Sequence, residues 1–152
     1  MPHDGLIMSG HANADGTGPM MAFNAEKLED WIAGKLGLTG SALKTRKSNI
    51  NAVVADFMGG RGKAVSHKTV HVNARGEKKT DQKAHTSKYR GSDVLHTSAG
   101  PRGRGGGVTI FYVNPQGRDG KIIGIGHHLT DSSYEIEWSV GDWHVGRMVQ
   151  LD

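Results

Sequence analysis

The chain of 152 residues contains no cysteine and no long apolar run. Without cysteine, disulfides, thiolate zinc sites and cysteine nucleophiles are excluded. No apolar run approaches the ~18 residues of a membrane-spanning helix, and the N-terminus lacks the charged and then apolar pattern of a signal peptide. We therefore expect a soluble protein that needs neither an oxidising compartment nor a membrane.

Apolar residues are also scarce, at 36% of the chain, whereas glycine is abundant, with 23 residues. This glycine content is about twice the usual share. The length fits one domain with a modest core and a good part of loop. Residues 1–21 have no periodic pattern, so we expect a disordered leader or a remnant of expression there. Residues 22–152 then form a single domain.

Charge is distributed unevenly along the chain. The net charge is +4, but residues 59–105 hold 11 Lys/Arg against 3 Asp/Glu, a net charge of +8. Residues 1–58 carry −1 and residues 106–152 carry −3. A basic block between two acidic parts favours an anionic partner, most often nucleic acid. The alternative is a solvated, flexible loop whose lysines confer solubility.

Two amphipathic helices are predicted after the leader. The first begins after Asn24 as N-cap, with Phe23 packed on Leu28, and ends at Gly37. Its apolar face holds Leu28, Trp31, Ile32 and Leu36. The second runs over about 41–58 and is stopped by two glycines. Its apolar stripe holds Leu43, Ile50, Val53, Val54 and Phe57.

Four short runs typical of β-strands occupy the last third of the chain. They are VTIFYV (108–113), KIIGIGHHL (121–129), YEIEW (134–138) and RMVQL (147–151). Turn-rich sequence separates them, which predicts an antiparallel meander. Residues 59–107 permit one short strand near 65–72 and otherwise predict a long, basic, glycine-rich loop. With both helices packed on one face of the meander, the fold class is α+β.

Alternation along the strands predicts which polar side chains meet. Glu135 and Glu137 share one strand face, and His128 points away from the aliphatic side chains of its own strand. If the aliphatic faces meet the helices, all three lie on the open face. Gly124 and Gly126 leave that face bare, so a flat ligand can approach it. An imidazole and a carboxylate there can act as an acid/base pair, although the same residues also suit a solvated strand end.

The segment GPRGRGGG (100–107) places Arg102 and Arg104 in a backbone that can bend closely around phosphate. Arginine can bind two phosphate oxygens at once, which lysine cannot do. The segment is not a P-loop, because no GK[ST] follows. The alternative interpretation is a flexible tether.

Nine histidines are present, and several lie in the basic block. His67 and His71 would lie ~13 Å apart in a strand. The neighbours His127 and His128 point to opposite faces, and no carboxylate follows at a metal-ligand spacing. We therefore expect neither a metal nor another cofactor. A histidine of the basic block can supply a second proton-transfer group, and His96 is the one nearest the sheet in sequence.

Residues 32–47 support a competing interpretation, because they resemble a helix-turn-helix. They have a small residue in the first helix, glycine at the turn and an apolar anchor in the second helix. The second helix would then present Lys44, Arg46 and Lys47 to DNA. A tight helical hairpin without any DNA contact needs the same glycine.

The strand VTIFYV, a turn and the glycine-containing strand GKIIGIGHH resemble the core of the RelE-like and barnase-like bacterial ribonuclease toxins. The resemblance covers residues 108–152. It implies a small α+β domain with helices on one face of the sheet, RNA on the opposite face, and cleavage without metal. C-terminal toxin domains of larger secreted bacterial proteins share this architecture, so the resemblance also implies delivery in that form and action in the cytoplasm.

The leading hypothesis is a metal-independent endoribonuclease in which a ribose 2′-OH attacks the adjacent phosphate. One group must take the 2′ proton, another must protonate the leaving 5′ oxygen, and cations must stabilise the phosphoryl charge. The candidate catalytic residues are His128, Glu137, Glu135 and His96. The candidate phosphate- or RNA-binding residues are Arg102, Arg104, Lys88, Arg90, Tyr89 and Tyr112, of which the two tyrosines can stack on a base.

The expected partners are RNA and, for a toxin, an acidic protein inhibitor such as an antitoxin or immunity protein. The alternative is a non-catalytic DNA- or RNA-binding protein that uses residues 32–47 and the basic loop. A third hypothesis is an interaction domain without any role in nucleic-acid binding.

Overall fold

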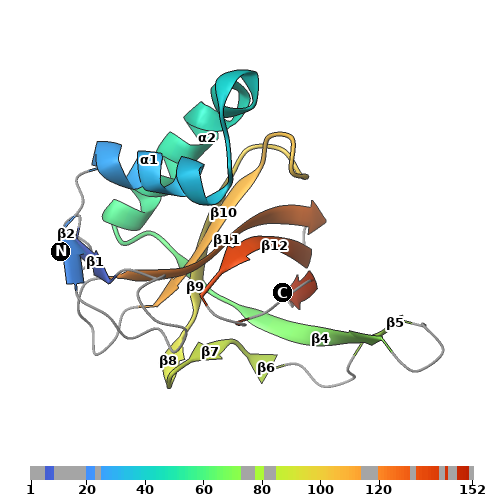
Figure 1. Ribbon diagram of the computed structural model, residues 1–152. Helices are drawn as coiled ribbons and strands as arrows, with labels where there is room; N and C mark the ends of the chain where they lie inside the picture. The colour runs from blue at the N-terminus through green and yellow to red at the C-terminus, as the bar shows by residue number, and fades with distance from the viewer. Residues whose placement is uncertain are drawn as a thin grey trace.

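The computed structural model describes residues 6–8, 20–22, 25–72, 78–80, 85–113, 120–130, 133–140, 143 and 147–150. Two helices lie against one face of a curved antiparallel sheet (Figure 1). The α+β class expected from the sequence is confirmed. The sheet has more strands than the meander of four that the sequence predicts, with nine in the described part of the chain.

The two helices form a hairpin. α1 covers Ala25–Lys35 and α2 covers Gly40–Met58. Gly37 follows α1 with a φ of +66°, a left-handed conformation that glycine adopts without the steric cost of a Cβ. Gly59 caps α2, as the sequence predicts. The expected cap and staple at residues 23–24 lie outside the described residues.

The main sheet follows the order β3-β9-β10-β11-β12-β13-β4-β5, and β6 also pairs with β4. Its strands are β3 (Lys63–Ala64), β4 (Ser66–Val72), β5 (Lys78–Thr80), β6 (His85–Thr86), β9 (Leu95–Ala99), β10 (Val108–Val113), β11 (Lys121–Thr130), β12 (Ser133–Ser139) and β13 (Arg147–Gln150). Two separate hairpins pair β1 (Leu6–Met8) with β2 (Met20–Ala22) and β7 (Lys88–Tyr89) with β8 (Ser92–Asp93).

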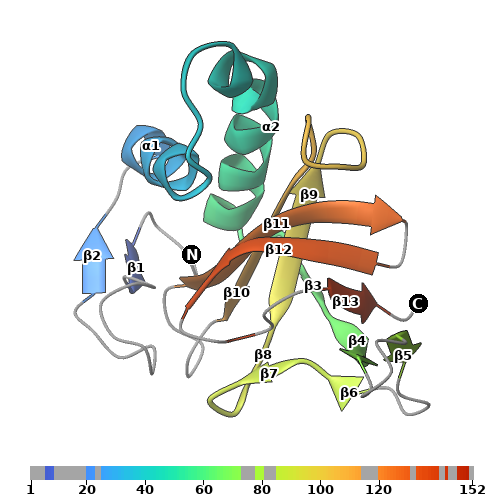
Figure 2. The same cartoon turned by 45° about the vertical axis from the view of Figure 1, so that its right-hand side comes forward.

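Two strands that follow each other in the chain lie near opposite ends of the sheet order, so the sheet must curl to bring its ends together. β3 is the first strand of the sheet order and β4 the last but one, yet only Val65 separates them in the chain. In Figure 2, β13, β4 and β5 lie below β11 and β12, where the sheet curves. The sheet therefore has an outer face, which carries the helices, and an inner face, around which it curls.

Each face of the sheet has its own hydrophobic core. The outer core, under the helices, is made of Leu28, Ile32, Ala33, Ile50, Val53, Val54, Phe57, Val108, Ile110, Tyr112, Ile122 and Ile125. The inner core is made of Val65, Val94, Phe111, Val113, Ile123, Tyr134 and Val140. The strands β10 and β11 contribute to both cores, so they are buried on both faces.

Within 59–107, the short strand permitted near 65–72 is found as β4, and residues 100–107 contain no strand, but the loop predicted for most of the other described residues is wrong. This segment holds the strands β3 to β9, and β9 pairs with β10 along its whole length. The sequence of β9, LHTSA, has the hydroxyl residues Thr97 and Ser98 at positions where apolar residues would have predicted a strand. Its Thr97 is nevertheless buried, because the side chain donates a hydrogen bond to Asp56 of α2.

Two β-bulges determine which side chains face the helices. Ile123 has no partner in β10, and it packs in the inner core although Ile125 packs in the outer one. Glu137 has no partner in β11, which pairs with Ile136 and then with Trp138. An extra residue in a strand breaks strict alternation. The bulges therefore change the arrangement of the polar side chains as well.

Candidate active site

His127, rather than His128, lies beside the glutamates of β12. The Nδ1 of His127 is 2.9 Å from Glu137 Oε2, and its Nε2 is 3.6 Å from Glu135 Oε1. The expectation that His128 shares a face with these glutamates is wrong, because the bulges turn both carboxylates toward the helices. His127 is only 1% exposed, so this histidine is part of the packed interior.

α2 supplies the counter-ion for this group. Arg46 Nη2 donates hydrogen bonds to Glu137 Oε2 at 2.9 Å and to the Gly107 carbonyl at 2.7 Å. Burial alone would raise the pKa of Glu137, but hydrogen bonds from Arg46 and His127 lower it below its ordinary value. Both ring nitrogens of His127 are directed at carboxylates. This buried network ties α2 to the sheet and to the loop before β10.

The two glycines of β11 do not leave a bare face. A Cβ on Gly124 would lie 2.7 Å from the Trp143 ring, and a Cβ on Gly126 would lie 2.0 Å from the Glu135 carbonyl. The glycines are therefore required by close packing. The expected approach of a flat ligand over Gly124 is blocked by Trp143.

His96 and His128 lie together on the inner face. Their ring centres are 6.5 Å apart and the rings meet edge to face, at 73°. Both rings also contact Tyr134, at 5.5 Å from His96 and 4.3 Å from His128. The pair forms because β9 and β11 flank β10 on either side. Both histidines were candidates from the sequence, but nothing in the sequence indicated that they meet.

Backbone carbonyls orient both rings. His96 Nδ1 lies 2.9 Å from the Lys63 carbonyl, and His128 Nδ1 lies 3.1 Å from the Thr130 carbonyl. A carbonyl only accepts hydrogen bonds, so in both rings Nδ1 carries the hydrogen and the neutral ring has its lone pair at Nε2. Burial lowers the pKa of His96, and the charges of His128 and Lys63 lower it further, against the hydrogen bond to Lys63. His96 is therefore suited to accept a proton near neutral pH.

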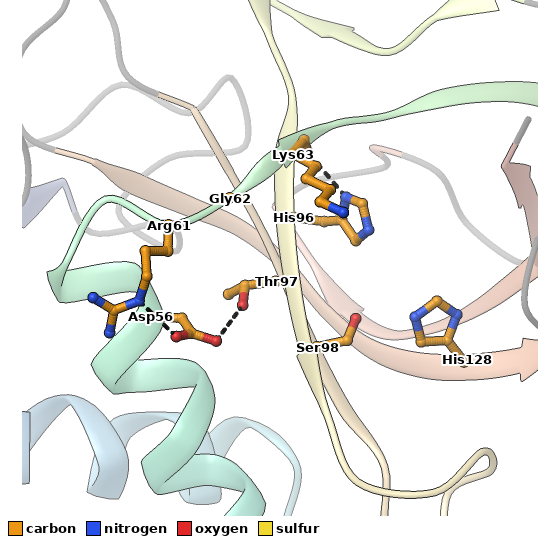
Figure 3. Close-up of a pocket in the computed structure, with 8 residues that line it drawn as sticks. All are labelled: Asp56, Arg61, Gly62, Lys63, His96, Thr97, Ser98 and His128. Carbon is orange, nitrogen blue, oxygen red and sulfur yellow. Dashed lines mark hydrogen bonds and ion pairs between the residues drawn. The ribbon is translucent and has the colours of Figure 1, made fainter. Parts of the chain in front are cut away.

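A hollow of about 420 Å³ opens beside this pair. Its lining residues are Asp56, Arg61, Gly62, Lys63, His96, Thr97, Ser98 and His128. Figure 3 shows His96, Ser98 and His128 on one side of β9, with Asp56 and Arg61 on the other. The hollow lies at an uncovered strand edge, because β3 pairs with residues 95–96 and no other described strand continues beside residues 97–99. We call it the Lys63 hollow.

The glycine-rich segment 100–107 places Arg102 next to His128. The N–H of Gly103 donates to the His128 carbonyl at 2.8 Å, and Asn49 of α2 donates to the Gly106 carbonyl at 2.9 Å. A second hollow, of about 670 Å³, is lined by Gly100, Pro101, Arg102 and His128. We call it the Arg102 hollow. His128 therefore lines both hollows.

The other candidate residues lie elsewhere. Arg104 pairs with Glu135 at 3.2 Å, on the outer face. Lys88 pairs with Asp93 across the β7–β8 hairpin. Neither hollow is lined by Lys88, Tyr89, Arg90 or Tyr112.

The two tyrosines differ in their surroundings. Tyr112 is fully buried against Phe57, so no face of its ring is available to stack on a base. Burial also raises the pKa of its hydroxyl group. Tyr89 is half-buried, with the Lys121 ammonium 5.0 Å from its ring centre.

The helix-turn-helix interpretation loses one of its three basic residues. Lys44 and Lys47 are exposed on α2, but Arg46 is buried in the pair with Glu137. A signal for this burial exists in the sequence. Arg46 lies four residues before Ile50, so it falls on the apolar stripe of its helix. Lys63 and Ser98, by contrast, carry no signal, because only the pairing of β9 brings them to the hollow.

Fold and site together define an α+β protein with a curled antiparallel sheet and a histidine pair on its inner face. Compared with protein-family models, with curated proteins and with solved structures, the chain matches none. Within the described residues, no three His, Cys, Asp or Glu side chains are arranged to hold a metal ion. No helix in the described part of the chain has the length and apolar character to cross a membrane.

Proposed function

We propose that the protein is an endoribonuclease that cleaves RNA by attack of a ribose 2′-OH on the adjacent phosphate, without a metal. The observation that supports this proposal is the pair of His96 and His128 beside two hollows with basic side chains. The reaction needs two proton-transfer groups on opposite sides of the phosphorus. The base must lie within about 3 Å of the 2′ oxygen, and the acid within about 3 Å of the leaving 5′ oxygen. With ring centres 6.5 Å apart, both imidazoles can reach oxygens of a single phosphate bound beside them.

The roles follow from the surroundings of the two rings. His96, with its lowered pKa and its Nδ1 hydrogen held by a carbonyl, takes the proton of the 2′-OH. His128 gives a proton to the leaving 5′ oxygen. Lys63 and Arg102 stabilise the charge that develops on the phosphoryl oxygens. RNA supplies its own nucleophile, so the protein needs no nucleophilic side chain.

The carboxylates of β12 fit this role less well. A catalytic group must reach its substrate, but the Glu137 side chain is only 8% exposed and already accepts hydrogen bonds from Arg46. His127 faces carboxylates with both nitrogens. We therefore propose a positioning role for this network: it holds the segment that carries Arg102.

Incubation of the purified protein with a defined single-stranded RNA, and with DNA of the same sequence, tests the proposal. We expect cleavage of the RNA alone, unchanged by EDTA, with products that end in a 2′,3′-cyclic phosphate and a 5′-OH. Cleavage of the DNA, or loss of all cleavage in EDTA, would contradict the mechanism. RNA binding without cleavage would favour the non-catalytic alternative.

A ribonuclease of this kind acts where RNA is exposed, in the cytoplasm, and a cell that makes it must restrain it. We propose that its inhibitor is an acidic protein that covers Lys63, Arg102 and the histidine pair. Electrostatic complementarity of this sort speeds association and depends on salt.

A further inference from the structure

We infer that the Lys63 hollow and the Arg102 hollow bind the nucleotides on the two sides of the cleaved bond, so that RNA crosses the uncovered edge of β9 with a fixed polarity. The nucleotide whose 2′-OH attacks lies in the Lys63 hollow, and the nucleotide that leaves lies in the Arg102 hollow. This inference rests on the proposed function, which by itself assigns no direction to the RNA.

The position of the phosphate follows from the linings of the two hollows. His96 lines only the Lys63 hollow, Arg102 lines only the Arg102 hollow, and His128 lines both. The hollows also succeed one another along the chain: β9 borders the first, and Gly100 follows directly on β9 in the second. An RNA strand that passes through both hollows therefore has the phosphate between its two nucleotides at His128, where the hollows adjoin.

The direction follows from the histidines. His96 shares its hollow with Lys63, whose charge disfavours the protonated ring, so His96 is the histidine that takes the 2′-OH proton. The Lys63 carbonyl holds the Nδ1 hydrogen of His96, so Nε2 is the accepting atom. The 2′ oxygen then bonds to phosphorus, the bond from phosphorus to the 5′ oxygen breaks, and His128 protonates that oxygen. A 2′,3′-cyclic phosphate remains in the Lys63 hollow. The released 5′-OH belongs to the nucleotide in the Arg102 hollow.

Arg102 is suited to hold the leaving side. Its side chain is exposed, and the Gly103 N–H that binds the His128 carbonyl keeps its segment beside the phosphate. On the attacking side, Lys63 and Arg61 line the hollow, and Arg61 is paired with Asp56 at 3.0 Å. Each hollow thus offers its own cation to a phosphate oxygen.

Oligodeoxynucleotides with a single ribonucleotide test this polarity, because they have one cleavable bond. One series is lengthened on the 3′ side of that bond and the other on the 5′ side. Arg102→Gln and Lys63→Gln are compared with the unaltered protein. Lys47→Gln is the control, since it removes one exposed charge from α2 and lies in neither hollow.

We expect Arg102→Gln to lose the gain in kcat/KM that 3′ extension gives, by about tenfold for one charged contact, and to keep the gain from 5′ extension. Lys63→Gln should show the converse, and Lys47→Gln neither. Loss of both gains by the same factor in Arg102→Gln, or an exchange of the two patterns, would overturn this inference and leave the proposed function intact. A failure of the unaltered protein to cut any RNA would overturn the proposed function as well.

Discussion

The rings of His96 and His128 lie 6.5 Å apart although they come from strands that do not pair with each other. β10 lies between those strands, and its Phe111 packs against His96 at 6.3 Å. Tyr134 closes the group from β12 and is fully buried. The pair is therefore supported by rigid sheet and aromatic packing on one side and open to the hollows on the other. Such support is what a precise acid/base pair requires.

The pH dependence of cleavage should report His96. Burial lowers its pKa below 6.5, and the Lys63 charge lowers it further. A general base acts only when deprotonated, so the rising limb of kcat/KM should have its midpoint below pH 6.5, and a falling limb at higher pH should report the general acid losing its proton. Lys63→Gln removes the facing charge and should move this rise to higher pH, measured in pH–rate profiles. An unmoved profile, or one that Lys47→Gln moves equally, would show that His96 is not the base.

Arg46 should matter for stability far more than its neighbour does. Arg46→Ala leaves Glu137 as a buried carboxylate without its main counter-ion, which costs about 3–5 kcal/mol. Lys47→Ala, on the exposed side of the same helix, should change the unfolding free energy by about 0.5 kcal/mol or less. Urea denaturation of both variants provides the measurement. Equal midpoints would mean that the buried network does not hold the fold together.

Glu137 should also make stability depend on pH. Its pKa in the folded protein is below the ordinary 4.5, because hydrogen bonds from Arg46 and His127 outweigh the effect of burial. The folded state then binds fewer protons than the unfolded state. The stabilisation is full above about pH 4.5 and is lost as the pH falls through the lower folded value. In Glu137→Gln, the unfolding free energy should fall less steeply over this acid range; parallel slopes would refute the assignment.

Gly100 offers a test of the connection between α2 and Arg102. Gly100 and Gly91 both have left-handed backbones, with φ of +86° and +82°. Alanine at either position costs about 1–2 kcal/mol of strain. Only at Gly100 would the new Cβ also lie 2.3 Å from Asn49 Nδ2 and push that side chain off its bond to Gly106.

We therefore expect Gly100→Ala, but not Gly91→Ala, to weaken RNA binding. If Arg102 no longer contacts a phosphate of the RNA, the slope of the logarithm of the RNA-binding constant against the logarithm of the salt concentration should fall in magnitude by about one. Binding titrations at several salt concentrations measure both quantities. Equal effects of the two substitutions would indicate that the strain alone, and not the displaced Asn49, is responsible.

The helices and the last strands were predictable because apolar residues recur in them at helical or strand spacing. The strand at 108–113 was predicted at its observed bounds. β9 was missed because Thr97 and Ser98 satisfy their hydroxyl groups through Asp56 and Thr109, so a buried strand looks polar in sequence. Only the three-dimensional pairing reveals those partners.

The candidate site was predictable only in part. His96, His128 and Arg102 were identified as residue types suited to the chemistry, and the structure brings them to adjoining hollows. Their grouping with Glu135 and Glu137 failed, because a β-bulge leaves no trace in an apolar pattern. One extra residue in a strand exchanges the faces of all residues beyond it.

Cleavage rates and melting temperatures of His96→Ala, His128→Ala and His127→Ala test the central claim most directly. The account predicts that the first two variants lose about 10²–10⁴-fold in rate and keep their melting temperature. His127→Ala should melt earlier and still cleave RNA at temperatures well below its transition. Parental rates in the His96 and His128 variants, together with a loss of cleavage in a folded His127→Ala protein, would contradict the account and place the chemistry at the carboxylates of β12.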